Sequence, residues 1–283
     1  MSAVAAAGLT RTFGAFTAVD AVDFHVDQGE VVGLLGANGA GKTTLIRLLL
    51  GVLRPTTGRV ELFGAPPTRA QRRRVGYVPQ NLGLYPDLTV RENLEFRAAL
   101  FNAEPSDFAH QERQVLGRLP LGIQRQAAFE AATQHAPDLL VLDEPTSGVS
   151  PLARSRLWNE IRERSDTGTA VLVSTHYMDE AEQADRIIMM ANGRIVAEGT
   201  VAEIIGGRQV VEVTADDWPA ALAALEGDDR LVLLDGRVIR ILGGGLAAVR
   251  ADLDRRSIPA AARVVPASLN ETLVDLTRAG ADR

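Results

Sequence analysis

The chain has 283 residues, of which 46% are hydrophobic, and this length allows one large core or one large and one small domain. The formal net charge of −6 argues against a general nucleic-acid-binding surface, and the absence of cysteine excludes disulfides and thiolate metal sites. No run approaches the roughly 18 apolar residues of a membrane span. The first residues lack the positive stretch of a signal peptide, so we expect a globular protein in the cytoplasm.

Strand-like and helix-like segments alternate around glycine turns from residue 1 to about 205. The clearest strand-like segments are short apolar runs at 31–35, 75–78, 139–142 and 170–174. Alternation of this kind predicts an α/β domain built on a parallel sheet. The composition changes at Gly206-Gly207. We therefore expect a first domain over residues 1–205 and a second over residues 206–283.

The second domain is predicted to be a small α+β unit. Two apolar runs flank Asp235-Gly236, a dipeptide that favours a β-hairpin. The strand-like segments are 210–213, 231–234, 238–241 and 262–265, and the helix-like segments are 220–225, 246–253 and 269–277.

A glycine-rich loop follows the strand-like run at 31–35 and precedes a helix-like run that begins at Thr44. The loop fits the pattern G-x-x-x-x-G-K-[ST] of a P-loop, in which backbone N–H groups and a helix N-terminus hold phosphates. Lys42 is expected to reach the β- and γ-phosphates, and the Thr43 hydroxyl to bind Mg²⁺. The predicted nucleotide-binding residues are Gly36, Ala37, Asn38, Gly39, Ala40, Gly41, Lys42, Thr43 and Thr44.

Two carboxylates end the strand-like run at 139–142. In a P-loop enzyme an acid at the end of such a strand helps to hold Mg²⁺, and a second acid can polarise the attacking water. Asp143 and Glu144 are the candidates for these two roles.

The order and spacing of these motifs resemble the ATPase subunits of ATP-binding-cassette (ABC) transporters, over residues 4 to about 205. The resemblance implies an ABC-type P-loop fold with a helical subdomain, and Mg-ATP hydrolysis. It implies that Phe13 stacks on adenine; the alternative is that Phe13 is a core residue. It also implies that Gln80, Thr43 and Asp143 shape the Mg²⁺ environment. Glu144 would act on the lytic water, and His176 would contact the γ-phosphate.

Finer features narrow the resemblance to exporters. The segments 84–93 and 174–182 are similar to ATPases of ABC-2-type exporters, and 267–277 is similar to the accessory domain of drug-exporter ATPases. This likeness implies two partners, a second ATP-binding cassette and a separate integral-membrane permease, with no nucleic acid. It also implies a place on the inner face of the cell membrane, reached through the permease.

Two segments depart from the family pattern. Leu119-Pro120-Leu121-Gly122-Ile123 stands where the family has the signature L-S-G-G-Q, which binds ATP held by the opposite cassette. Pro120 removes a hydroxyl and an N–H donor, and Leu121 adds a side chain where glycine allows close approach. Ser150 replaces a family aspartate. The sequence leaves open whether this loop is a tolerated variant or a crippled site. We therefore expect either an asymmetric assembly with a second cassette or a chain that alone is a slow ATPase.

Three functions are consistent with these patterns. The first is the ATP-hydrolysing subunit of an ABC exporter. The second is a soluble ABC-type ATPase acting on a ribosome or nucleic acid. The third is a weakly hydrolysing regulatory cassette paired with an active one. The exporter-like segment after Gln80 favours the first.

Overall fold

The computed structural model describes residues 2–108, 112–227 and 230–281. The chain forms two compact units, Met1–Glu198 and Gly199–Arg283. Helix α7 (Val201–Ile205) belongs to the second unit, whereas the sequence places the domain division after it. The division at residue 205 stays a prediction that truncation can test.

The main sheet of the first unit has the strand order β5-β6-β7-β3-β8-β9. The pairs from β5 through to β8 are parallel, as the alternating pattern predicts. Because β7 lies between β3 and β6, strands far apart in the sequence end side by side. The strands are β3 (Val31–Leu35), β5 (Val75–Val78), β6 (Leu139–Asp143), β7 (Ala170–Thr175), β8 (Arg186–Ala191) and β9 (Arg194–Gly199).

A second sheet of this unit, in the order β2-β1-β4, is antiparallel. Its strands are β1 (Ser2–Phe13), β2 (Phe16–Asp27) and β4 (Thr57–Leu62). The sequence did not predict it. Alanine is depleted in strands, and β1 carries the run Ala5-Ala6-Ala7.

Helices cover the main sheet, and two of them begin in ways that the sequence explains. Thr89 and Glu92 form a capping box at the start of α3, and the Ser150 hydroxyl caps α5 ahead of Pro151. The structure gives α1 (Lys42–Leu49), α2 (Arg69–Arg72), α3 (Val90–Phe101), the 3₁₀ turn η1 (Leu116–Arg118), α4 (Leu121–Thr133), α5 (Pro151–Asp166) and α6 (Met178–Ala181).

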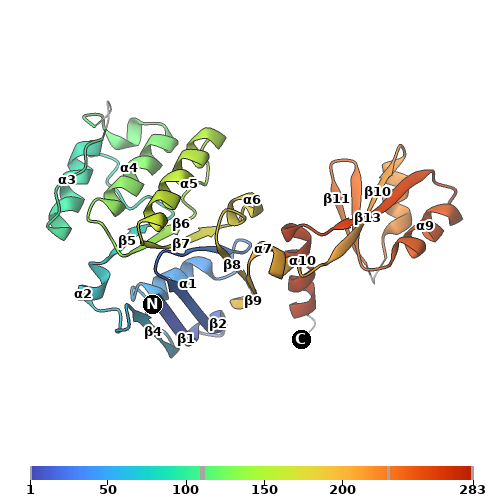
Figure 1. Cartoon of the computed structure of the whole chain (residues 1–283), viewed down its shortest axis with the longest axis horizontal. Helices are drawn as coiled ribbons and strands as arrows, with labels where there is room; N and C mark the ends of the chain where they lie inside the picture. The colour runs from blue at the N-terminus through green and yellow to red at the C-terminus, as the bar shows by residue number, and fades with distance from the viewer. Residues whose placement is uncertain (1, 109–111, 228–229, 282–283) are drawn as a thin grey trace. The chain divides into compact units, whose positions relative to one another are not determined.

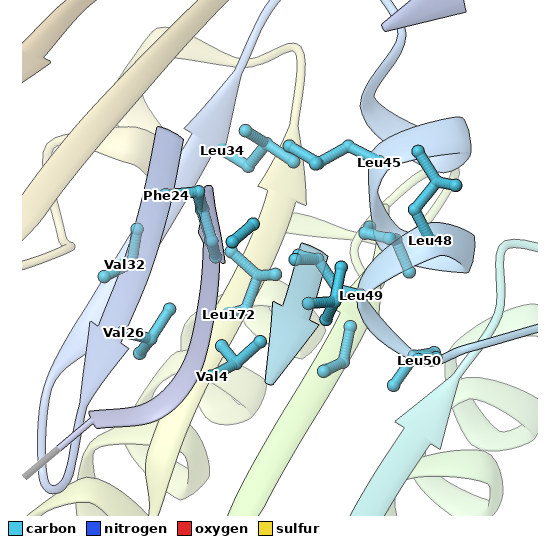
Figure 2. Packing of buried hydrophobic residues seen from close by; sticks show 14 of the residues in the cluster. Val4, Phe24, Val26, Val32, Leu34, Leu45, Leu48, Leu49, Leu50 and Leu172 are labelled. Carbon is cyan, nitrogen blue, oxygen red and sulfur yellow. The ribbon is translucent and has the colours of Figure 1, made fainter. Parts of the chain in front are cut away.

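Alternate residues of the parallel strands enter two different cores, because successive side chains of a strand point to opposite faces. On one face Leu34 and Leu172 pack with Leu45 of α1 and Phe24 of β2, as Figure 2 shows. On the other face Val171 and its neighbours pack with α4 and α5, which lie across the sheet from α1 (Figure 1). The site residues at the strand ends therefore rest on a sheet that is packed on both sides.

The predicted helical subdomain is present. Helices α3 and α4 pack together with a small core that includes Val90, Leu94, Leu116 and Ala127. The loop that contains Gln80 leads into this subdomain from the end of β5.

The second unit is an antiparallel sheet in the order β11-β12-β10-β13, with α8 and α9 on one face. Its chain order is the βαββαβ arrangement followed by α10. Val213 and Ile239 meet Leu225 and Leu253 in a core of its own. The elements are β10 (Gln209–Ala215), α8 (Trp218–Leu225), β11 (Leu231–Asp235), β12 (Val238–Leu242), α9 (Leu246–Arg255), β13 (Ala260–Pro266) and α10 (Leu269–Ala281).

Within the described ranges, no helix combines the length and the apolar character that a bilayer crossing requires.

Candidate nucleotide-binding site

The P-loop links β3 to α1, and two of its glycines have no room for a side chain. A Cβ at Gly36 would lie 2.5 Å from the carbonyl oxygen of Met190. A Cβ at Gly41 would lie 2.5 Å from the carbonyl oxygen of Ala18, and Gly41 also has a φ of +104°. Only glycine meets both conditions at Gly41. The loop is therefore a tightly packed stretch of bare backbone at a helix N-terminus.

Lys42 is folded back over this loop. Its side chain is buried, and Nζ donates to the carbonyl oxygens of Gly36 at 2.7 Å and Ala37 at 3.2 Å. Nζ also lies 3.8 Å from Oε1 of Glu144. Burial lowers the pKa of Lys42, and the carboxylates of Glu144 and Asp143 oppose that shift. The Lys42 ammonium is thus a poorly hydrated charge held against the backbone of the P-loop.

Ser174 connects the two candidate carboxylates. Its hydroxyl, at the end of β7, donates to Oδ1 of Asp143 at 2.6 Å and accepts from the backbone N–H of Glu144 at 3.0 Å. The other carboxylate oxygen of Asp143, Oδ2, is buried and has no hydrogen-bond partner among the described residues. An ionised oxygen left in that state is costly unless a cation or its bound water satisfies it.

Glu144 stands on a strained backbone. Its φ is +51°, a left-handed conformation that is uncommon for a residue other than glycine and costs on the order of 1–3 kcal/mol. The turn directs its side chain toward two predicted partners. Gln80 Nε2 donates to Oε2 of Glu144 at 3.2 Å, and Nδ1 of His176 lies 3.6 Å from the same oxygen. Glutamine and histidine, from two other strand ends, thus converge on one carboxylate.

A cavity of about 390 Å³ lies over this convergence. The lining includes most of the P-loop together with Gln80 and Glu144, so the structure brings these predicted residues together. Phe13 does not belong to the described lining, whereas Phe16 does. Phe13 is 46% exposed, and the Arg11 guanidinium carbon lies 4.5 Å from its ring centroid. The lining residues are Phe16, Ala18, Asn38, Gly39, Ala40, Gly41, Lys42, Thr43, Thr44, Gln80 and Glu144.

Comparison with known proteins agrees with this geometry. Residues 19–147 match the protein family described as ABC transporter. The Nod factor export ATP-binding protein I of Burkholderia thailandensis is 42% identical over 224 residues, which cover 72% of this chain and 73% of that protein. The chain belongs to the ABC transporter family. A solved ATP-binding subunit of an ABC transporter is 28% identical and has a TM-score of 0.66, over 71% of this chain and 91% of that one.

A further ABC relative differs in length. The probable multidrug ABC transporter ATP-binding protein YbhF of Escherichia coli is 38% identical over 208 residues, which cover 68% of this chain. The match covers only 36% of that protein, so this ABC chain spans about a third of the first curated relatives that it matches.

The unusual signature segment of this ABC cassette begins helix α4. Pro120 occupies the N-cap position, and no side chain caps the helix. Leu121 is exposed, and its Cδ2 would lie 2.9 Å from a Cβ at Gly148. A largely apolar cavity of about 530 Å³ lies between α4 and α5 at this point. Its lining includes no residue of the P-loop, so we place the nucleotide site at the P-loop cavity.

Sequence reasoning missed two contributors to the site. Phe16 lines the P-loop cavity, but an aromatic residue in a strand is usually a packing residue, and only its 63% exposure marks it. Ser174 belongs to the segment 174–182 that resembles exporter ATPases, but the resemblance gives it no role. Its position at a strand end between two acids in the folded sheet was the missing information.

Proposed function

We propose that this chain hydrolyses Mg-ATP as one cassette of a dimer and drives export through a separate membrane permease. The observation that carries the proposal is the meeting of Lys42, Gln80 and His176 around the strained, buried Glu144 at the edge of a P-loop cavity. Phosphoryl transfer needs positioning and charge neutralisation more than covalent chemistry. A site with these groups supplies both.

Binding of the nucleotide falls to the P-loop backbone and Lys42. Because Nζ already lies close to the carbonyls of Gly36 and Ala37, it needs only a small turn to face β- and γ-phosphate oxygens. The N-terminus of α1 adds its partial positive charge. An aromatic ring, predicted at Phe13, would stack on the adenine.

The residues present fit a magnesium ion. Asp143 Oδ2 is a buried oxygen without a partner among the described residues, and Thr43 and Gln80 both line the cavity. Mg²⁺ keeps several waters and is usually bound through one or two carboxylates together with substrate phosphates. Thr43, Gln80 and Asp143 would hold the ion, which would neutralise phosphate charge.

Glu144 is the proposed general base. Its carboxylate would polarise the lytic water, while Gln80 donates to Oε2 and keeps it oriented. His176 lies against the same oxygen. There it would contact the γ-phosphate and fix the position of the water relative to the phosphate. The Lys42 ammonium lies 3.8 Å from Oε1 of the same carboxylate.

An apolar surface beside Gln80 supports the permease as partner. Tyr85, Phe96 and Leu100 are each more than two-fifths exposed, and the rings of Tyr85 and Phe96 meet edge to face at 5.4 Å. Exposed apolar side chains gathered on one surface mark an interaction site. The loop from Gln80 leads directly to Tyr85, so a partner on this surface would be coupled to the base. Through the permease the chain would lie at the inner face of the cell membrane.

Purification of the full chain from membranes tests the proposal. We expect an integral-membrane protein to co-purify and Mg-ATP turnover to be measurable in that complex. The matched control is Glu144→Gln, which keeps the size of the side chain and should retain the partner while turnover falls roughly 10²–10⁴-fold. Retention of ribosomes or nucleic acid in place of a membrane protein would overturn the exporter role. Unchanged turnover in Glu144→Gln would overturn the assignment of the base.

A further inference from the structure

Glu180, on the short helix α6, is a completely buried carboxylate that the proposed mechanism does not use. Its Oε1 accepts from the Thr146 hydroxyl at 2.6 Å, and its Oε2 accepts from the Thr175 hydroxyl at 2.8 Å. The Nε of Arg154, on α5, lies 3.1 Å from Oε1. Two hydroxyls and a guanidinium thus compensate a charge that would otherwise be too costly to bury.

The two threonines come from the two segments that place the site's key side chains. Thr146 lies in the turn that follows Glu144, and Thr175 is the last residue of β7, directly before His176. The Thr175 oxygen also accepts from the backbone N–H of Tyr177 at 3.0 Å. The Glu180 carboxylate therefore connects the turn after β6, which carries Glu144, to the loop after β7, which carries His176.

Arg154 makes a second contact with the same loop. Its guanidinium carbon lies 4.8 Å from the centroid of the Tyr177 ring. The Tyr177 ring also contacts the His176 ring, with the two centroids 4.1 Å apart and the two planes tilted by 38°. His176 has no hydrogen bond at Nδ1 among the described residues. Its orientation therefore depends on the packing of Tyr177 and on the backbone that Thr175 holds.

We propose that Glu180, with Arg154 as its counter-ion, is a positioning residue that fixes His176 relative to Glu144. The Glu180 carboxylate accepts from both threonines at once, so it sets the separation of the two loops. Loss of either bond frees the His176 loop to turn away from Oε2 of Glu144. This inference rests on the proposed ATPase function for its kinetic consequence, while its structural consequence is independent of that function.

The first experiment measures the loop itself. Glu180→Gln keeps the shape of the side chain, but its amide NH₂ cannot accept from a threonine hydroxyl, so one of the two bonds is lost. Backbone amide exchange of the full chain should become faster at Tyr177 and its neighbours. The control is Arg162→Met on the same helix α5, where Arg162 pairs with Asp185 at 2.7 Å. Equal exchange in wild type, Glu180→Gln and the control would refute the proposal, whatever the activity of the chain.

The second experiment measures turnover. Glu180→Gln should lower kcat for Mg-ATP about tenfold or more, the effect of one charged hydrogen bond, with KM within about twofold. Arg154→Met should act in the same direction and less strongly, because both threonine bonds remain. In a His176→Ala background the effect of Glu180→Gln should disappear, since it acts through His176.

If the effects of Glu180→Gln and His176→Ala on kcat are fully additive, Glu180 has a merely structural role. The same conclusion follows if Arg162→Met lowers kcat as much as Glu180→Gln does. Absence of turnover in wild type would instead count against the proposed function. In that case amide exchange at Tyr177 still decides the role of Glu180.

Discussion

The ammonium of Lys42 lies 3.8 Å from Oε1 of Glu144, so the cation of the P-loop and the candidate base face each other directly. Both side chains are buried, and the pairing is stronger in such a place than at the surface. A triphosphate that entered the cavity would compete with Glu144 for Lys42. Binding of the nucleotide would thereby release the carboxylate toward water.

Lys42→Ala should weaken binding of Mg-ATP. A hydrogen bond to a charged group contributes about 1.5–3 kcal/mol, which corresponds to a loss of affinity of about tenfold or more. Titration with a fluorescent ATP analogue measures the change. Arg47→Ala is the control, because Arg47 is an exposed cation in the last turn of the same helix. Equal affinity in Lys42→Ala and wild type would remove the P-loop assignment.

Phe13→Ala should weaken ATP binding through the loss of base stacking, which contributes about 1–3 kcal/mol per base. Competition by inorganic tripolyphosphate, which has no base, should not change in this variant. Phe16→Ala is the comparison, because Phe16 lines the cavity and Phe13 does not. A loss of ATP affinity in Phe16→Ala alone would assign the stacking role to Phe16.

The combined substitution Pro120→Ser with Leu121→Gly should accelerate ATP turnover of the purified chain. In a pair of identical chains Pro120 offers the opposite ATP neither a hydroxyl nor an N–H, so each site lacks up to two donors. Restored donors should raise turnover about tenfold or more per bond, and a second cassette with a standard signature should raise it likewise. If wild type alone turns over ATP fast, and the double substitution does not change the rate, then the signature segment supports full activity with Pro120 and Leu121 in place.

The free energy of unfolding should fall as the pH drops below about 6.5, and His135 should cause part of that fall. Burial lowers the pKa of His135, the bond to the Val75 carbonyl opposes this, and the charge of Arg97 adds to it. Its stabilising contribution is therefore present above the unfolded pKa and is lost as the pH falls through the folded pKa. His135→Phe keeps an aromatic ring on Phe101 and should reduce the pH dependence of the unfolding free energy measured in urea. An equal pH dependence in both proteins would contradict this.

Truncation after residue 198 should leave ATP binding intact. The cavity lining lies wholly before this point, and the second unit has its own core. A chain cut after residue 205 should bind equally well but aggregate more readily, because α7 would lose its packing on α10 and expose Ile204. Solubility and analogue binding of the two truncated chains give the answer. Loss of folded protein in both would show that neither boundary separates independent domains.

The sequence predicted the parallel sheet and the site motifs because those features are local. A continuous apolar run such as Val31–Leu35 can only be a buried strand or a buried helix, and the glycine-rich loop after it decides between them. The tail elements were predicted for the same reason, with the Asp235-Gly236 turn marking the hairpin.

Other features depend on tertiary partners and were beyond the sequence. Strand β1 is rich in alanine and forms only because β2 and β4 pair with it on either side. The positive φ of Glu144 is imposed by the turn and by its bonds to Ser174, and no residue pattern signals it. The cavity beside Phe16 depends likewise on how β2 lies against the P-loop.

The strand order of the main sheet determines when the site can form during synthesis. Strand β7 separates β3, which leads to Lys42, from β6, which leads to Glu144. In a chain that ends before residue 170 these two strands have no common neighbour. Ser174 and His176 are also absent at that length. Chains fold as they emerge from the ribosome, and pairings between distant segments form slowly. A nascent chain therefore carries the nucleotide motifs for some time before it can assemble them, and ATP hydrolysis must wait until β7 is in place.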